Sequence, residues 1–110
     1  MKYTKEQIES AKHQLRAVRK GDTLYTIVRN VARSGMSREI SVFIARGKEV
    51  RDISWAVAVT LGWSQNKNTR AVKIGGCGMD MGFHLVNSLS YAMHGTKCDK
   101  AGYTLEHRWL

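Results

Sequence analysis

Proline is absent from the 110 residues, and cysteine occurs only twice. Without proline, every segment with strand character is free to pair through its backbone, although this selects no particular topology. Cys77 and Cys98 lie far apart, and neither belongs to a C-x-x-C pair, which argues against a zinc knuckle or a thioredoxin-like site. We interpret both as reduced thiols, and a disulfide between them is the less favoured alternative in a cytosolic protein.

Long hydrophobic runs are also missing. The longest apolar stretch, residues 55–61, is interrupted by Thr60 and falls far short of the roughly 20 residues that a membrane span needs. No apolar core of a signal peptide follows Lys2. We therefore expect a cytoplasmic protein without a membrane partner.

Charge of one sign dominates the chain. Its net charge is +9, and residues 1–51 hold 12 Lys and Arg against 5 Asp and Glu, whereas residues 52–110 hold 6 against 4. A basic first half attracts polyanions such as nucleic acid. The alternative is that the charge serves solubility alone.

The length and the 43% hydrophobic content predict a single basic α+β domain over residues 1–110 with one core. Hydrophobic spacing predicts an N-terminal helix, an antiparallel β-meander, a short helix, a strand, a longer amphipathic helix and a C-terminal strand. The corresponding ranges are 5–20, then 24–33, 40–44 and 49–53, then 55–61, 70–74, 79–94 and 103–109. The polar run 64–69 is expected to be a loop.

Cations line one side of the first predicted helix, which opens with a capping box at Thr4 and Gln7. They are Lys5, Lys12, Arg16 and Arg19. Such a stripe is a candidate contact for phosphates, and the alternative is an ordinary solvated face.

A second candidate lies in the predicted hairpin turn, with the sequence Arg33-Ser34-Gly35-Met36-Ser37-Arg38. Guanidinium groups bind phosphate oxygens in pairs, and serine hydroxyls and the open glycine backbone add short donors. The candidate phosphate ligands are Arg33, Ser34, Gly35, Ser37 and Arg38. The alternative is a solvated turn.

A glycine-rich turn between a strand and a helix is the second phosphate site that the sequence suggests. Gly76 and Gly78 let the backbone approach a ligand, and free amides at a helix start attract anions. Asp80 satisfies the same amides and repels phosphate, so it is equally a helix cap. The candidate residues of this second site are Gly76, Gly78, Asp80 and His84. Close backbone packing of the glycines is one alternative, and a catalytic loop is another.

Asp80 and His84 lie four residues apart on the same predicted helix, and Cys77 and His107 are placed to join them. Together they suggest an acid-base or metal site, but their spacing matches no zinc signature. We predict no catalytic residue, no metal and no cofactor.

Aromatic side chains offer surfaces for stacking bases wherever they are exposed. Most are expected in the core, and Trp63, next to the polar loop, is the first stacking candidate. The others are Trp55, Trp109, Tyr25, Tyr91 and Tyr103.

The Ser34-Gly35-Met36-Ser37-Arg38 turn, the block GCGMDMGFHLV over residues 76–86 and the ending His107-Arg108-Trp109-Leu110 together resemble a group of small proteins encoded by bacteriophages and prophages. The likeness covers about residues 25–110. It implies an origin in a mobile element and action inside a bacterial host cell, and it carries no established activity. Small early phage proteins often antagonise host defences, which is an analogy of class only.

Three functions remain open from the sequence. The first is a non-enzymatic protein that binds nucleic acid or a host nucleoprotein complex, for example as an inhibitor of a defence system such as CRISPR; an inhibitor of a host protein with an acidic surface overlaps with it. The second is a protein that sequesters a nucleotide or another small phosphorylated ligand through the glycine-rich turn and the hairpin arginines. The third is a metal-dependent phosphoesterase or nuclease that uses Asp80 and His84. The oligomeric state is not determined by the sequence.

Overall fold

The computed structural model describes residues 3–30, 37–75, 81–102 and 104–109 of the chain. The elements in chain order are α1 (Lys5–Leu15), β1 (Thr23–Asn30), β2 (Ser37–Arg46), β3 (Glu49–Asp52), α2 (Ser54–Leu61), β4 (Val72–Gly75), α3 (Met81–His94), α4 (Cys98–Ala101) and β5 (Thr104–Trp109). The α+β class is confirmed, and so is the meander of β1, β2 and β3.

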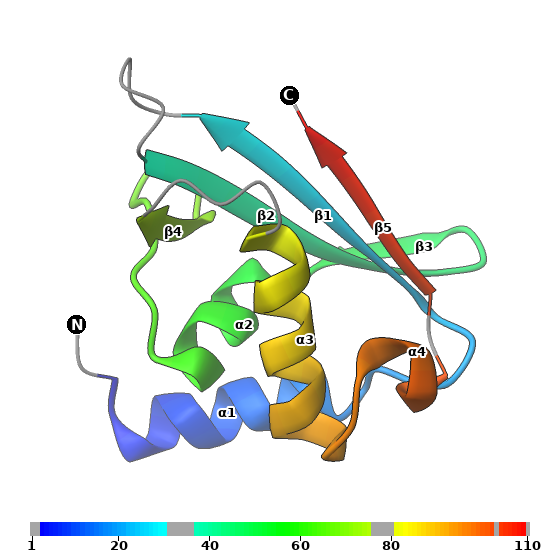
Figure 1. The fold of residues 1–110 in the computed structure, drawn as a ribbon. Coiled ribbons are helices and arrows are strands. Elements are labelled where there is room, and N and C mark those ends of the chain that lie inside the picture. The colour runs from blue at the N-terminus through cyan, green and yellow to red at the C-terminus, as the bar shows by residue number, and fades with distance from the viewer. Residues whose placement is uncertain (1–2, 31–36, 76–80, 103, 110) are drawn as a thin grey trace.

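One five-stranded sheet forms the upper layer in Figure 1, with the strand order β3-β2-β1-β5. β2 pairs antiparallel with β1 on one side, and on its other side it pairs with β3 at one end and β4 at the other. β5 runs parallel to β1. The sequence predicted β5 as a strand but did not predict its partner, because alternation of polar and apolar residues does not specify a neighbour.

The helices gather on one side of this sheet (Figure 1). α2 packs against β2 and β4, α3 packs against β1, and α1 packs against α2. Alternate residues of the central strands are buried on the helix side, namely Leu24, Val28, Ile40, Val42 and Ile44. Since successive strand residues point to opposite faces, the residues between them form the other face of the sheet.

The first helix is shorter than expected. Its capping box is present, since the Gln7 amide donates to Thr4 Oγ1 (3.1 Å) and the Thr4 amide donates to Gln7 Oε1 (2.9 Å). The helix ends at Leu15 rather than at residue 20. There the chain tightens, because the Val18 amide bonds to the carbonyl three residues back (3.0 Å). Arg19 is therefore outside the helix, and the predicted four-cation stripe is incomplete.

The second helix, α2, is apolar on every side, with Ala56, Val57, Ala58 and Val59 all buried. It ends at Gly62, whose φ of 72° is in the left-handed region that favours glycine. A helix that is hydrophobic all round belongs in a core, and α2 lies between the sheet and α1.

Short α4 is the one described helix that the sequence patterns missed. It spans only four residues and buries none of them, so it has no hydrophobic periodicity to detect. The thiol of Cys98, its first residue, is free of any disulfide and donates to Asn87 Oδ1 at 3.3 Å. Cys77 lies outside the described residues. Among those residues, no helix is long and apolar enough to cross a bilayer.

A buried ion pair fixes the chain that follows α1 onto the sheet. Asp22 is 2% exposed, and Arg46 Nε and Nη2 of β2 each donate to its carboxylate at 2.8 Å. The Arg19 amide donates to the same carboxylate, and Arg46 also reaches the carbonyl of Ala17. The hydrogen bonds from Arg46 hold the pKa of Asp22 below its ordinary value of 3.8.

The substitution Asp22→Asn should lower stability at pH 7 by about 1–2 kcal/mol, a modest value because half-exposed Arg46 is screened by solvent. A carboxyl with a lowered pKa stabilises the fold above its unfolded pKa and loses that contribution as pH falls through its folded pKa. The difference between wild type and variant in urea unfolding should therefore shrink below about pH 3.8. Asp99→Asn, at an exposed position in α4, is the control, and an equal deficit at all pH values would contradict the assignment.

Candidate functional site

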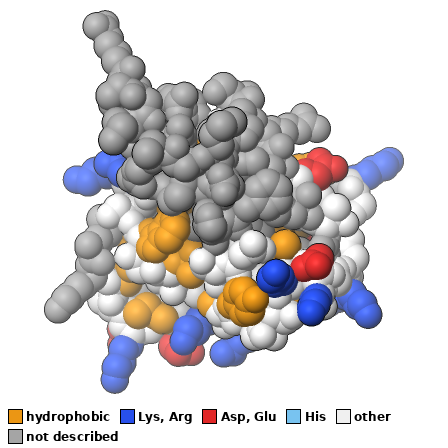
Figure 2. Space-filling model, in the orientation of Figure 1, with side chains coloured by type: hydrophobic (Ala, Val, Ile, Leu, Met, Phe, Trp, Pro, Cys, Tyr) orange, Lys and Arg blue, Asp and Glu red, His pale blue; other side chains and the backbone are white. Residues whose placement is uncertain are grey.

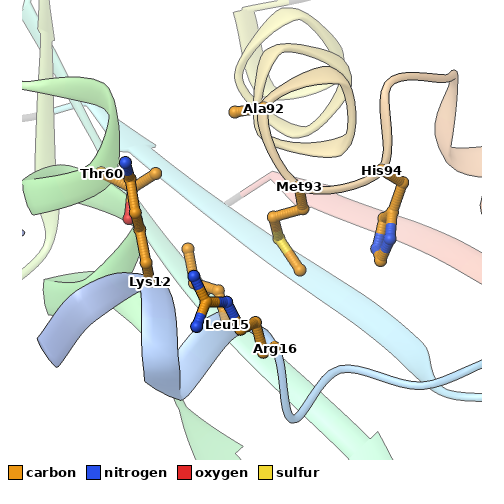
Figure 3. A pocket seen from close by; sticks show the side chains of 7 residues that line it. All are labelled: Lys12, Leu15, Arg16, Thr60, Ala92, Met93 and His94. Atoms are coloured by element: carbon orange, nitrogen blue, oxygen red, sulfur yellow. The ribbon is translucent and has the colours of Figure 1, made fainter. Parts of the chain in front are cut away.

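A cavity of about 630 Å³ opens between α1, α2 and α3. α1 contributes Lys12, Leu15 and its C-cap residue Arg16, α2 contributes Thr60, and the last turn of α3 contributes Ala92, Met93 and His94. Figure 3 shows Lys12 extending from α1 toward Thr60, while Met93 and His94 point from the end of α3 toward α1. The volume lies in the range of small-ligand sites.

The lining of this cavity contains basic side chains and no acidic ones. Of its seven lining residues, two are cations, one is a histidine, and none carries a carboxylate. Leu15 is 1% exposed, and Met93 packs against the core, so the floor is apolar. Lys12 and Arg16 are exposed beside this apolar floor, so both cations can be reached by an anion from solvent.

Thr60 adds a polar group without a partner. Its Oγ1 is buried and makes no hydrogen bond with any part of the chain that the structure describes. A buried hydroxyl without a partner loses the hydrogen bonds that it made to water. Thr60 is therefore a cavity-lining residue whose hydroxyl lacks a hydrogen bond within the described part of the chain.

Two of the four predicted helix cations, Lys12 and Arg16, lie at this cavity, because residues four apart on a helix share one face. Lys5 is exposed at the start of α1, and Arg19 is exposed beyond its end. On the face seen in Figure 2, Lys and Arg side chains are spread around the rim, with hydrophobic side chains between them. The basic charge is therefore distributed there rather than gathered in one stripe.

Most residues of the hairpin and glycine-rich motifs lie outside the described residues. These are Arg33, Ser34, Gly35, Gly76, Gly78 and Asp80. Their flanks are described. Ser37 and Arg38 open β2 and pair with Gly75 and Ile74 of β4. The described flanks of the two motifs, Ser37 and Gly75, are 38 residues apart in sequence and are paired at one end of β2 and β4.

The members of the proposed acid-base group lie in different elements or outside the described residues. His84 belongs to α3 and His107 belongs to β5, where it pairs with Thr26, while Asp80 and Cys77 lie outside the described residues. Within the described ranges, no group of three His, Cys, Asp or Glu side chains is placed to hold a metal. The sites of Asp80 and His84 stay predictions.

Thr60, Met93 and His94 were missed by the sequence patterns. They belong to two helices that are separated by a strand and that meet α1 only in the folded chain, so no local spacing marks them. Trp63, the first stacking candidate, is half-buried against the core, and its carbonyl accepts a hydrogen bond from the Tyr3 hydroxyl at 2.6 Å.

The structure defines an α+β protein with helices on one side of a mixed sheet and a cation-lined cavity among those helices. No protein-family model, no curated protein and no solved structure matches the chain. The resemblance to phage-encoded proteins therefore stays a prediction from the sequence motifs.

Replacing Thr60 with Val should leave stability unchanged or raise it by up to about 1 kcal/mol, because the lost hydroxyl has no partner to leave behind. Thr69→Val is the matched control. It removes a hydroxyl that donates to the buried Glu39 carboxylate at 3.3 Å, and it should destabilise the protein. Thermal and urea unfolding of both variants measure the effect. A Thr60→Val protein as destabilised as Thr69→Val would show that the Thr60 hydroxyl is satisfied.

Proposed function

We propose that the protein binds nucleic acid, or a host complex that contains nucleic acid, without catalysing a reaction. The observation that carries this proposal is the cavity where Lys12, Arg16 and His94 line one opening and no lining residue is acidic. Phosphate contacts from Lys and Arg supply most of the sequence-independent affinity for nucleic acid. Net charge +9 adds long-range attraction for the same partner.

The length of α3 favours a polymer over a single nucleotide as the main partner. The cavity lies at the C-terminal end of α3, and residues 76–80 lead from the paired flanks of the two predicted phosphate motifs to its N-terminal end. Fourteen helical residues span about 21 Å at 1.5 Å each. One DNA strand carries about six phosphates over that length. A strand can therefore reach both regions, whereas one nucleotide reaches only one.

The resemblance to phage-encoded proteins adds a cellular location and a target to this proposal. It supports action inside a bacterial host cell and a target in a host defence complex, such as a CRISPR effector. A host protein with an acidic surface is bound by the same charges. Copurification from bacterial cells, with half of the sample treated with nuclease, separates the two: a partner lost on nuclease treatment is nucleic acid or depends on it.

Binding of a labelled oligonucleotide should weaken steeply with salt, because each neutralised phosphate releases counterions. The double variant Lys12→Ala and Arg16→Ala should reduce the slope of log K against log salt by about 2, or about 1 per cation. Lys67→Ala with Lys100→Ala, two exposed cations outside the cavity, should leave the slope closer to that of wild type. Affinity that does not change between about 50 and 200 mM salt would overturn the proposal.

The second candidate function is the sequestering of a nucleotide or another small phosphorylated ligand. It is favoured by the volume of the cavity, which suits a small ligand, and by the pairing of Ser37 with Gly75, which brings the flanks of both predicted phosphate motifs together. The cavity and the end of the β2 and β4 pair are each a candidate site for one phosphate group. The third function, a metal-dependent phosphoesterase, depends on Asp80 and His84 and would be promoted by turnover that disappears in His84→Ala.

Free nucleotides should raise the melting temperature if this second function holds, and the rise should increase with ligand concentration. Loss of the rise in Lys12→Ala and Thr60→Val would assign the ligand to the cavity, whereas loss in Arg38→Ala would assign it to the end of β2 and β4. Inorganic phosphate at the same ionic strength is the control. A nucleotide panel with no shift would overturn this second function.

A further inference from the structure

The face of the sheet opposite the helices carries a second, apolar surface. A groove of about 450 Å³ lies on the central strands and is lined by Tyr25, Thr26, Ile27, Phe43, Ala45, Gly47 and Val50. Val50 is 60% exposed, and it is one of two large hydrophobic side chains exposed in the described part of the chain. Figure 1 shows the helices gathered on the other side of the sheet. We call this surface the open face.

Two aromatic rings occupy neighbouring positions on the open face. Tyr25 of β1 pairs directly with Phe43 of β2 in the antiparallel register. Directly opposite residues of adjacent strands have Cβ atoms about 5 Å apart on the same face. Both side chains are half-buried, so each ring packs on the sheet and keeps part of its surface open.

The charged residues next to the aromatic pair indicate which chemical groups of a ligand can bind there. Asp52 of β3 pairs with Phe43, and Glu106 of β5 pairs with Tyr25, so a carboxyl residue stands at each end of the aromatic row. Carboxylates repel phosphates and accept hydrogen bonds from the amino groups of bases. Bases, rather than phosphates, therefore match the aromatic row.

We propose that the open face binds single-stranded nucleic acid by stacking bases on Tyr25 and Phe43. This inference depends on the proposed function in one respect, because it takes nucleic acid as the partner, but it concerns a different face from the cavity. Unpaired bases stack on aromatic side chains of an exposed sheet without requiring a particular sequence. Duplex bases are stacked on each other and have no free face to offer.

A second copy of this chain is the competing occupant. In a two-fold pair of open faces, each aromatic row meets its own copy, which carries Asp52 and Glu106 at its ends. Each chain also brings a net charge of +9. The charge that opposes self-association favours a polyanion, so the observations point to nucleic acid.

The test compares two oligonucleotides of equal length and charge, one with bases and one abasic, at one salt concentration. Each stacked base contributes about 1–3 kcal/mol, which corresponds to roughly 5–150-fold in affinity. Wild type should bind the base-bearing strand more tightly than the abasic strand by a factor in that range. Tyr25→Ala and Phe43→Ala should each reduce this preference at least about fivefold, while affinity for the abasic strand stays close to that of wild type.

Matched variants separate stacking from loss of structure. Tyr25→Phe keeps the ring and should keep the preference, and Tyr91→Ala removes a tyrosine that is 52% exposed on α3 and should have no effect. Far-ultraviolet circular dichroism checks that each variant is folded. A variant at either ring that weakens both oligonucleotides equally would overturn stacking.

The result also distinguishes this inference from the function on which it depends. Equal binding of both oligonucleotides by wild type, with a steep salt dependence, overturns base stacking and leaves the phosphate contacts intact. Absence of salt-dependent binding to either strand overturns the proposed function itself. A wild-type dimer that Phe43→Ala converts to a monomer, together with no preference for bases, would assign the open face to a second copy.

Discussion

Backbone pairing along β2 is the constraint on which the rest of the molecule depends. At ten residues it is long enough to pair with β1 over its length and with both β3 and β4 along its other side. β4 returns to this edge only after α2, and α2 therefore has to cross the sheet between the two strands. Ser54, the first residue of α2, hydrogen-bonds through its hydroxyl to both the amide and the carbonyl of Val42 on β2 (2.8 and 3.3 Å). The helix start is thereby attached to the strand.

The two candidate binding surfaces follow from this arrangement. Because β2 and β1 bury one face under α2 and α3, the cations of α1 meet the end of α3 above the core, while the aromatic pair of the central strands is left on the opposite side. A thin mixed sheet separates the surfaces. Under the two proposals, phosphate contacts and base contacts belong to different faces of the molecule.

The order of elements and the three-stranded meander could be predicted from the sequence, since hydrophobic period and turn residues are local signals. What depends on distant contacts could not. The local sequence of β5 does not indicate that it pairs with β1, and the local sequence of β4 does not indicate that it pairs with β2. Two of the four predicted cations, Lys12 and Arg16, lie at the cavity because they are one helical turn apart. Arg19 does not line it, since it follows the tight turn that Asp22 stabilises. Thr60 and His94 are brought to the cavity by packing alone.

The hydrophilic run 64–69 is a loop, as its composition predicts, but its side chains also bind a buried residue of the sheet. Its Asn66 and Thr69 side chains donate to the carboxylate of Glu39, which is only 2% exposed, and its backbone closes a small hairpin through the bond from the Asn66 amide to the Ala71 carbonyl (2.9 Å). Polar side chains here anchor the turn at a buried acceptor. For protein engineering, an affinity tag or fluorescent reporter would therefore disturb the core less at the exposed Gly47 turn than in this run, although Gly47 also lines the open face.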